Sequence, residues 1–152
     1  MRIFLPVADT EHALLRSGAA RLALEPGRTA WAVTASARAD RPREDLEDLE
    51  YDALQDAVYA ALQTGSDDDD PHRRALVVAG DTEDAALAEA GEEAGAYGVV
   101  TTAATGLRIA SLHVTELGAR AVEQDDTDPA LLWFDVSEGP RALAYLHGGP
   151  EA

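Results

Sequence analysis

The chain has 152 residues, and its 46% hydrophobic content is enough apolar material for the core of one domain. Its 29 acidic and 12 basic residues give a net charge of −17, which argues against binding to DNA, RNA or anionic membrane surfaces. The absence of cysteine excludes disulfides, thiolate metal sites and cysteine nucleophiles, and the absence of lysine excludes Schiff-base chemistry and a phosphate-loop lysine.

The first half of the chain predicts two strands and one long helix. Short apolar or alternating runs indicate the strands, and glycine and proline residues mark the turns between elements. Acidic residues crowd the start of the long helix, as the helix dipole favours. The expected elements are a strand at residues 2–7, a short helix ending before Gly18, a strand at 28–35, a polar linker at 35–44 and a helix from about Pro42 to Gln63 or Thr64.

The second half alternates more apolar runs with short helical or polar segments. Residues 75–80 are almost continuously apolar, which is typical of a strand buried on both faces. The expected elements are a flexible acidic loop at about 66–72, strands at 75–80, 98–103, 107–116 and 131–136, short helices at about 83–90 and 117–122, and a closing helix at 139–147.

This order of elements favours an α/β fold, with α+β as the other possibility. The strands and helices alternate without an internal repeat. We therefore expect a single domain over residues 1–152, with a mixed sheet of five to six strands and helices packed on it. No apolar stretch approaches the roughly 18 residues of a membrane span, and the short opening run does not resemble a secretory signal. The expected location is cytoplasmic.

Four sequence features suggest ligand binding or catalysis, but their spacing does not support it. The glycines of residues 91–98 follow a helix instead of leaving a strand, as a dinucleotide loop requires. The aspartates of residues 67–70, next to His72, lack the offsets of a calcium loop. The four histidines have no paired metal-ligand spacing, and no serine lies in a GxSxG motif. We expect neither a cofactor nor a metal site.

One acidic residue of the long helix stands out because it faces the apolar side. Counting about 100° per residue from Leu46, Glu50 lies near 40°, in the same arc as Leu49 and Ala53. A buried carboxylate must be paired, hydrogen-bonded or protonated. Arg38, on the preceding linker, is the nearest candidate partner along the chain. The sequence therefore predicts a structural Glu50–Arg38 pair, with a ligand-binding carboxylate or a position at the rim of the core as alternatives.

Two further residues extend this feature into a candidate polar site. Tyr51 follows Glu50 directly, and His113 lies on the face of an alternating strand that carries Ser111. A carboxylate, an imidazole and the guanidinium of Arg38 can together support acid–base chemistry on an anionic substrate. A hydrogen-bonded structural histidine is the simpler interpretation of His113.

Nearly the whole chain resembles a known family of small actinobacterial proteins classed as a domain of unknown function. The resemblance rests on MRIFLP at the start, AVTASAR followed by the acidic LEDLEYDAL helix, RRALVVAGD, the LHV segment and LLWFDVSE near the end. It implies a common fold and a cytoplasmic setting, and it assigns no catalytic residue.

Three hypotheses about function follow. The first is a non-enzymatic interaction or regulatory module, in which Trp31 and Trp133 help the acidic surface to bind a basic protein partner. The second is a small enzyme or ligand-binding domain with the polar site of Arg38, Glu50, Tyr51 and His113. The third is an acidic mimic of nucleic acid.

Overall fold

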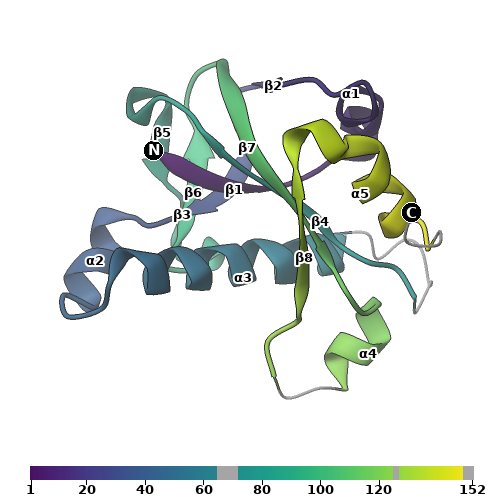
Figure 1. The fold of residues 1–152 in the computed structure, drawn as a ribbon. Helices are drawn as coiled ribbons and strands as arrows, with labels where there is room; N and C mark the ends of the chain where they lie inside the picture. Colours follow the sequence, from purple (N-terminus) through teal and green to yellow (C-terminus); the bar gives the residue numbers. More distant parts are fainter. Residues whose placement is uncertain (65–71, 125–126, 149–152) are drawn as a thin grey trace.

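The computed structural model describes residues 1–64, 72–124 and 127–148, and it shows one curled β-sheet with helices on both faces (Figure 1). Within these ranges the sheet has eight strands, and all their pairings are antiparallel. The strands are β1 (Arg2–Pro6), β2 (Arg21–Leu24), β3 (Thr29–Ala32), β4 (Leu76–Asp81), β5 (Leu87–Glu89), β6 (Gly98–Thr101), β7 (Thr105–Thr115) and β8 (Leu131–Asp135). The fold is therefore α+β, and the expected mixed sheet of five to six strands is wrong in number and direction.

The strand order is β2-β7-β4-β1-β3-β6-β5, with β8 also paired to β7. The long strand β7 pairs with β4 along one of its edges. Along its other edge, the first half of β7 pairs with β2 and the second half pairs with β8. The register between β4 and β7 shifts between Ala79 and Gly80. Gly80 is required there because a Cβ would lie 2.6 Å from the carbonyl oxygen of Arg108.

The described helices lie on opposite faces of the sheet. The α-helices are α1 (His12–Arg16), α2 (Ala35–Asp40), α3 (Leu46–Thr64), α4 (Ala119–Glu123) and α5 (Gly139–Leu146), and the short 3₁₀ turns are η1 (Asp9–Glu11), η2 (Asp84–Ala86), η3 (Glu92–Ala94) and η4 (Val136–Glu138). Helix α3 crosses β1, β3 and β4 on one face, whereas α1 packs on α5 and α5 packs on β7 (Figure 1).

Two apolar clusters hold these layers together. Alternate residues of β1, such as Ile3 and Leu5, point into the cluster closed by α1 and α5. Phe4 points the other way and packs with Leu49 and Ala53 of α3. As expected for a strand between two packed faces, β4 is buried on both sides.

Two predicted segments have a different structure. Residues 35–44 are not simply a polar linker: they contain α2, because the hydroxyl of Thr34 accepts a hydrogen bond from the Ala37 N–H and caps a helix. The helix expected at 83–90 is the turn η2 followed by β5, which pairs with β6. The acidic loop expected at about 66–72 lies outside the described residues, apart from His72.

Candidate functional site

The polar residues predicted to form one site lie in separate surroundings. Arg38 is exposed on α2, and Tyr51 points outward from α3, with its hydroxyl 3.3 Å from Oδ2 of Asp128. Glu50 is half-buried near the start of α3. Among the described residues, no hydrogen bond or ion pair joins Glu50 to Arg38. The predicted Glu50–Arg38 pair is therefore wrong, and Glu50 occupies the rim position that was the alternative.

Glu50 and His113 both interact electrostatically with the guanidinium of Arg2. Its hydrogen bonds to Asp81, at 2.9 and 3.2 Å, raise the pKa of Arg2, and the negative charges of Asp81 and Glu50 add to this effect. Burial lowers the pKa of His113 to about 4, with a further contribution from the Arg2 charge. Nε2 of His113 lies 2.9 Å from Oγ of Ser111. The imidazole is therefore neutral at pH 7 and is hydrogen-bonded to a hydroxyl.

Among the described residues, the carboxylate that is buried and paired is Glu11, which was not predicted from the sequence. Its two oxygens accept hydrogen bonds from Arg28 at 2.7 and 3.1 Å, and Oε1 also accepts one from the Ala8 N–H at 2.9 Å. Burial opposes ionisation, but these bonds outweigh it and lower the pKa of Glu11. The pair links the segment after β1 to the start of β3. The available sequence signal was an arginine directly after the Pro26-Gly27 turn.

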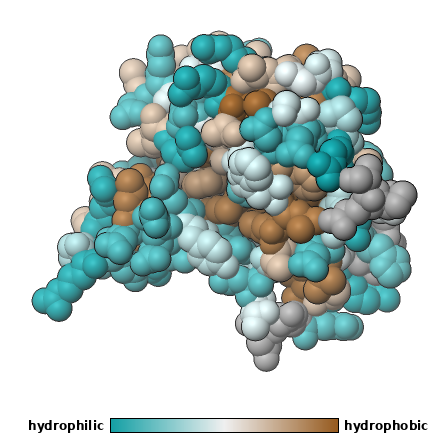
Figure 2. All heavy atoms as spheres, in the orientation of Figure 1, coloured by the Kyte–Doolittle hydropathy of each residue, from teal (hydrophilic) through white to brown (hydrophobic). Residues whose placement is uncertain are grey.

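The two tryptophans differ in exposure. Trp31 is half-buried against the α3 cluster, and its Nε1 donates a hydrogen bond to the Ala94 carbonyl at 3.3 Å. Trp133 is 61% exposed on β8, opposite His113 in the register with β7. Hydrophobic residues are exposed over β8 and α4, with hydrophilic residues around them (Figure 2). Trp133 is therefore the tryptophan that a partner can reach.

A cavity of about 430 Å³ lies beside α3, and we call it the acidic cavity. Three carboxylates and one guanidinium line it, so its formal charge is −2. The lining residues are Arg41, Asp52, Gln55, Asp56, Tyr59, Ala96, Tyr97 and Asp128.

The polar groups of the acidic cavity are only partly satisfied. Nη1 of Arg41 donates to Asp52 at 2.6 Å and to the Tyr97 hydroxyl at 3.3 Å. Burial and the neighbouring Asp52 carboxylate raise the pKa of Asp56, although Arg41 opposes this. Gln55 is 5% exposed and donates from Nε2 to the Pro129 carbonyl at 3.4 Å, while its Oε1 has no partner.

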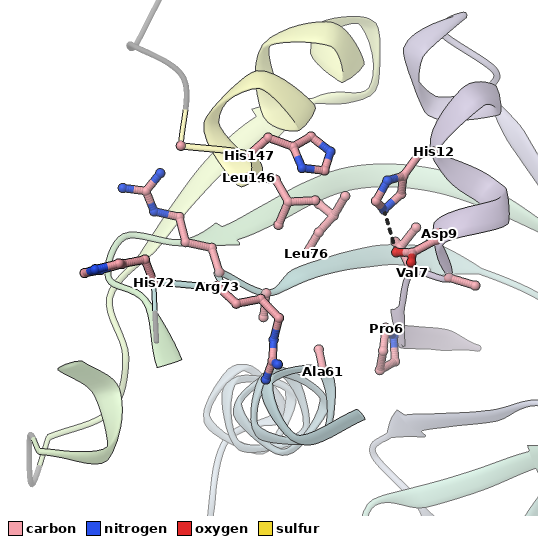
Figure 3. A pocket seen from close by; sticks show the side chains of 14 residues that line it. Pro6, Val7, Asp9, His12, Ala61, His72, Arg73, Leu76, Leu146 and His147 are labelled. Carbon is pink, nitrogen blue, oxygen red and sulfur yellow. Dashed lines mark ion pairs between the residues drawn. The ribbon is translucent and has the colours of Figure 1, made fainter. Parts of the chain in front are cut away.

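A second cavity, of about 650 Å³, lies between η1, the end of α5 and the start of β4 (Figure 3), and we call it the cationic cavity. Its charged or titratable lining residues are Asp9, His12, His72, Arg73, Arg74 and His147. The His12 and His147 rings make an edge-to-face contact, with centroids 5.6 Å apart, whereas the His72 side chain points away (Figure 3). Burial lowers the pKa of His12, and His147 contributes to this.

Arg74 connects the cationic cavity to α5. Its Nη1 donates to the Tyr145 carbonyl at 2.6 Å, and its guanidinium lies 4.1 Å from the centroid of the Tyr145 ring. Its Nε is buried without a hydrogen-bond partner. The cavity therefore combines histidines with cationic N–H groups, which is the chemistry that binds small anions.

Comparison with known proteins identifies one family. A family model described as "Family of unknown function (DUF6912)" matches residues 1–143. No curated protein and no solved structure gives a significant match. In the part of the chain that the structure describes, no helix is long and apolar enough to cross a membrane, and no group of three acidic or histidine side chains is arranged to hold a metal ion.

Proposed function

Since the chain belongs to DUF6912, a family of unknown function, we propose a function from its surface: a non-enzymatic interaction module that binds a basic protein segment on α3. The observation that carries this proposal is the composition of α3. The helix has five acidic residues and no basic one: Glu47, Asp48, Glu50, Asp52 and Asp56. Such a surface attracts a positively charged partner and is repelled by a negatively charged one.

The same helix also presents aromatic side chains for contact. Tyr51 is 47% exposed and Tyr59 is 39% exposed. Tyrosine suits an interface because its ring supplies apolar area while its hydroxyl keeps a polar partner. We call the outward side of α3, with Glu47, Asp48, Tyr51, Asp52, Asp56 and Tyr59, the α3 acidic face.

Trp133 extends this surface onto β8. The segment that leads into β8 contacts α3 through Tyr51 and Asp128, and through Gln55 and Pro129. The α3 acidic face and the exposed tryptophan therefore lie on connected elements. A basic segment with one apolar residue has both a charged and an apolar contact available there.

An NMR titration tests this proposal. The probe is a short peptide that alternates arginine and lysine with glycine and serine, and the control is the same peptide with glutamate in place of the basic residues. We expect amide shifts along α3, at Asp128 and at the Trp133 indole with the basic peptide alone. Shifts spread evenly over all acidic surfaces, or centred on Glu83 and Glu89 beside and in β5, would contradict the proposal.

The cationic cavity supports a second candidate function, the binding of a small phosphate or carboxylate compound. The neighbouring rings of His12 and His147 and the guanidinium of Arg74, which line the same cavity, carry this alternative. An anion beside the rings should raise the pKa of His12, because it stabilises the imidazolium. Imidazole NMR titrations with and without inorganic phosphate test this, and an unchanged pKa would argue against the alternative.

A further inference from the structure

We infer that the acidic cavity is a receptor for one arginine side chain of the basic partner, an inference that rests on the proposed function. The cavity faces solvent beside α3 and lies next to the exposed Tyr59. It is lined by hydrogen-bond acceptors in excess of donors. A guanidinium offers five N–H donors and no acceptor, so it complements this lining.

Gln55 supplies the first argument for a missing donor. The side chain is almost completely buried, and its amide nitrogen is directed to the Pro129 carbonyl. This orientation leaves Oε1 as a buried acceptor without a partner, in a residue that lines the cavity. Buried polar atoms in folded proteins are nearly always paired, so an orphaned acceptor beside a cavity indicates a donor that arrives from outside.

Asp56 supplies the second argument. Its carboxylate is half-buried and close to that of Asp52, and both effects oppose its ionisation. Asp52 already accepts a short hydrogen bond from Arg41, so the local positive charge is largely directed to that carboxylate. An incoming cation would remove the repulsion between the two aspartates.

The chain itself shows how this cavity holds a guanidinium. Arg41 binds there through one nitrogen that contacts both Asp52 and the Tyr97 hydroxyl. A second guanidinium has the carboxylates of Asp56 and Asp128 as acceptors in the remaining lining, close to the buried Oε1 of Gln55, and the Tyr59 ring is available for stacking. Planar stacking and several directed N–H groups favour arginine over lysine, whose ammonium is a compact, strongly hydrated charge.

Binding of single capped amino acids tests the inference directly. The probes are N-acetyl-arginine amide, the corresponding lysine compound, and the citrulline compound, which keeps the shape of arginine without its charge. We expect arginine to shift the Gln55 side-chain amide and the Asp56 backbone amide at millimolar concentration. Lysine should bind at least about threefold more weakly, and citrulline should have no effect.

A pair of variants locates the binding. Asp56→Asn removes a charge from the wall and should weaken arginine binding at least about fivefold. Asp48→Asn removes the same charge from an exposed position of the same helix, outside the lining, and should change binding less than about twofold.

The outcomes separate this inference from the proposed function. If the basic peptide still binds α3 but arginine and lysine probes bind equally, or Asp56→Asn has no more effect than Asp48→Asn, the arginine receptor is wrong and the interaction module stands. If the basic peptide does not bind α3, both are wrong. The comparison of probes on the unmodified chain keeps the test valid even if Asp56→Asn fails to fold.

Discussion

The carboxylate of Glu11 and the guanidinium of Arg28 meet at two points, with N···O distances of 2.7 and 3.1 Å, and so join the segment after β1 to β3. Arg28 also donates to the Pro6 carbonyl at 3.0 Å. Replacing Glu11 by glutamine removes the charge and leaves Arg28 without its main partner. We expect Glu11→Gln to lower the free energy of unfolding by about 1 to 3 kcal/mol. Asp9→Asn, at a fully exposed side chain, is the matched control and should change little.

The same pair predicts a dependence of stability on pH. The folded-state pKa of Glu11 lies below its ordinary value of 4.5. Its contribution is therefore complete above pH 4.5 and is lost as the pH falls through the folded-state pKa. Urea unfolding between pH 6 and pH 3 should show this loss in the parent chain, and a smaller loss in Glu11→Gln. Parallel curves for the two chains would show that the pair does not act in this way.

On acidification, His113 should produce a separate loss of stability, in a higher pH range than that of Glu11. Its ordinary pKa is 6.5 and its folded-state pKa is about 4, so the unfolded chain binds a proton more readily. Stability should fall from about pH 6.5 to about pH 4, by roughly 2 to 4 kcal/mol in total, and then level off for this residue. His113→Gln, which keeps a polar partner for Ser111, should remove this step. Imidazole NMR signals that titrate near pH 6.5 would contradict it.

Glu50 should matter little for stability. It is half-buried at the rim and is not paired with Arg38, so Glu50→Gln and Arg38→Ala should each change the free energy of unfolding by less than about 1 kcal/mol. Chemical denaturation measures both. A loss well above about 1 kcal/mol in both variants would instead support the buried Glu50–Arg38 pair that the helix periodicity predicts.

Gly139 is required by the contact between α5 and α1. A Cβ at this position would overlap the Leu15 carbonyl oxygen, and backbone cannot move aside as a side chain can. Although alanine favours helices, Gly139→Ala should destabilise the protein by about 1 to 3 kcal/mol. Gly91→Ala is the control, because a Cβ there meets nothing within 4 Å. A lower melting temperature for Gly139→Ala alone is the expected result.

Local patterns in the sequence predict the elements that they determine. The strands predicted at 75–80 and 131–136 are confirmed as β4 and β8, as is the closing helix α5, whose proline lies in its first turn. The short strand β2 was missed because its alternation is only four residues long, and it becomes a strand through pairing with β7. The antiparallel direction of the strands was also not predicted, because it depends on which distant strands pair.

The site residues show a similar limit. Helix periodicity predicts the direction in which the Glu50 side chain points, but not which groups lie there. In the structure, the charged group that interacts with Glu50 is Arg2. Glu11 and Arg28 meet because β1 pairs antiparallel with β3, which brings the segment after β1 beside the residue before β3. Their separation along the chain does not predict this pairing. The acidic cavity was also missed, since its walls come from α3, Tyr97 and the segment before β8. The sequence showed only that acidic residues are concentrated in α3.

The most direct test of the account compares two double variants that each remove two negative charges. Glu47→Gln with Asp48→Asn changes the α3 acidic face, and Glu83→Gln with Glu89→Gln changes exposed positions beside and in β5. We would measure the affinity of each chain for the basic peptide by calorimetry at low and physiological salt. The α3 variant should bind roughly tenfold more weakly at low salt and the β5 variant less than about twofold, with the difference shrinking at higher salt. Equal weakening of both variants would show that the peptide senses only the net charge of the protein, and would contradict a binding face on α3.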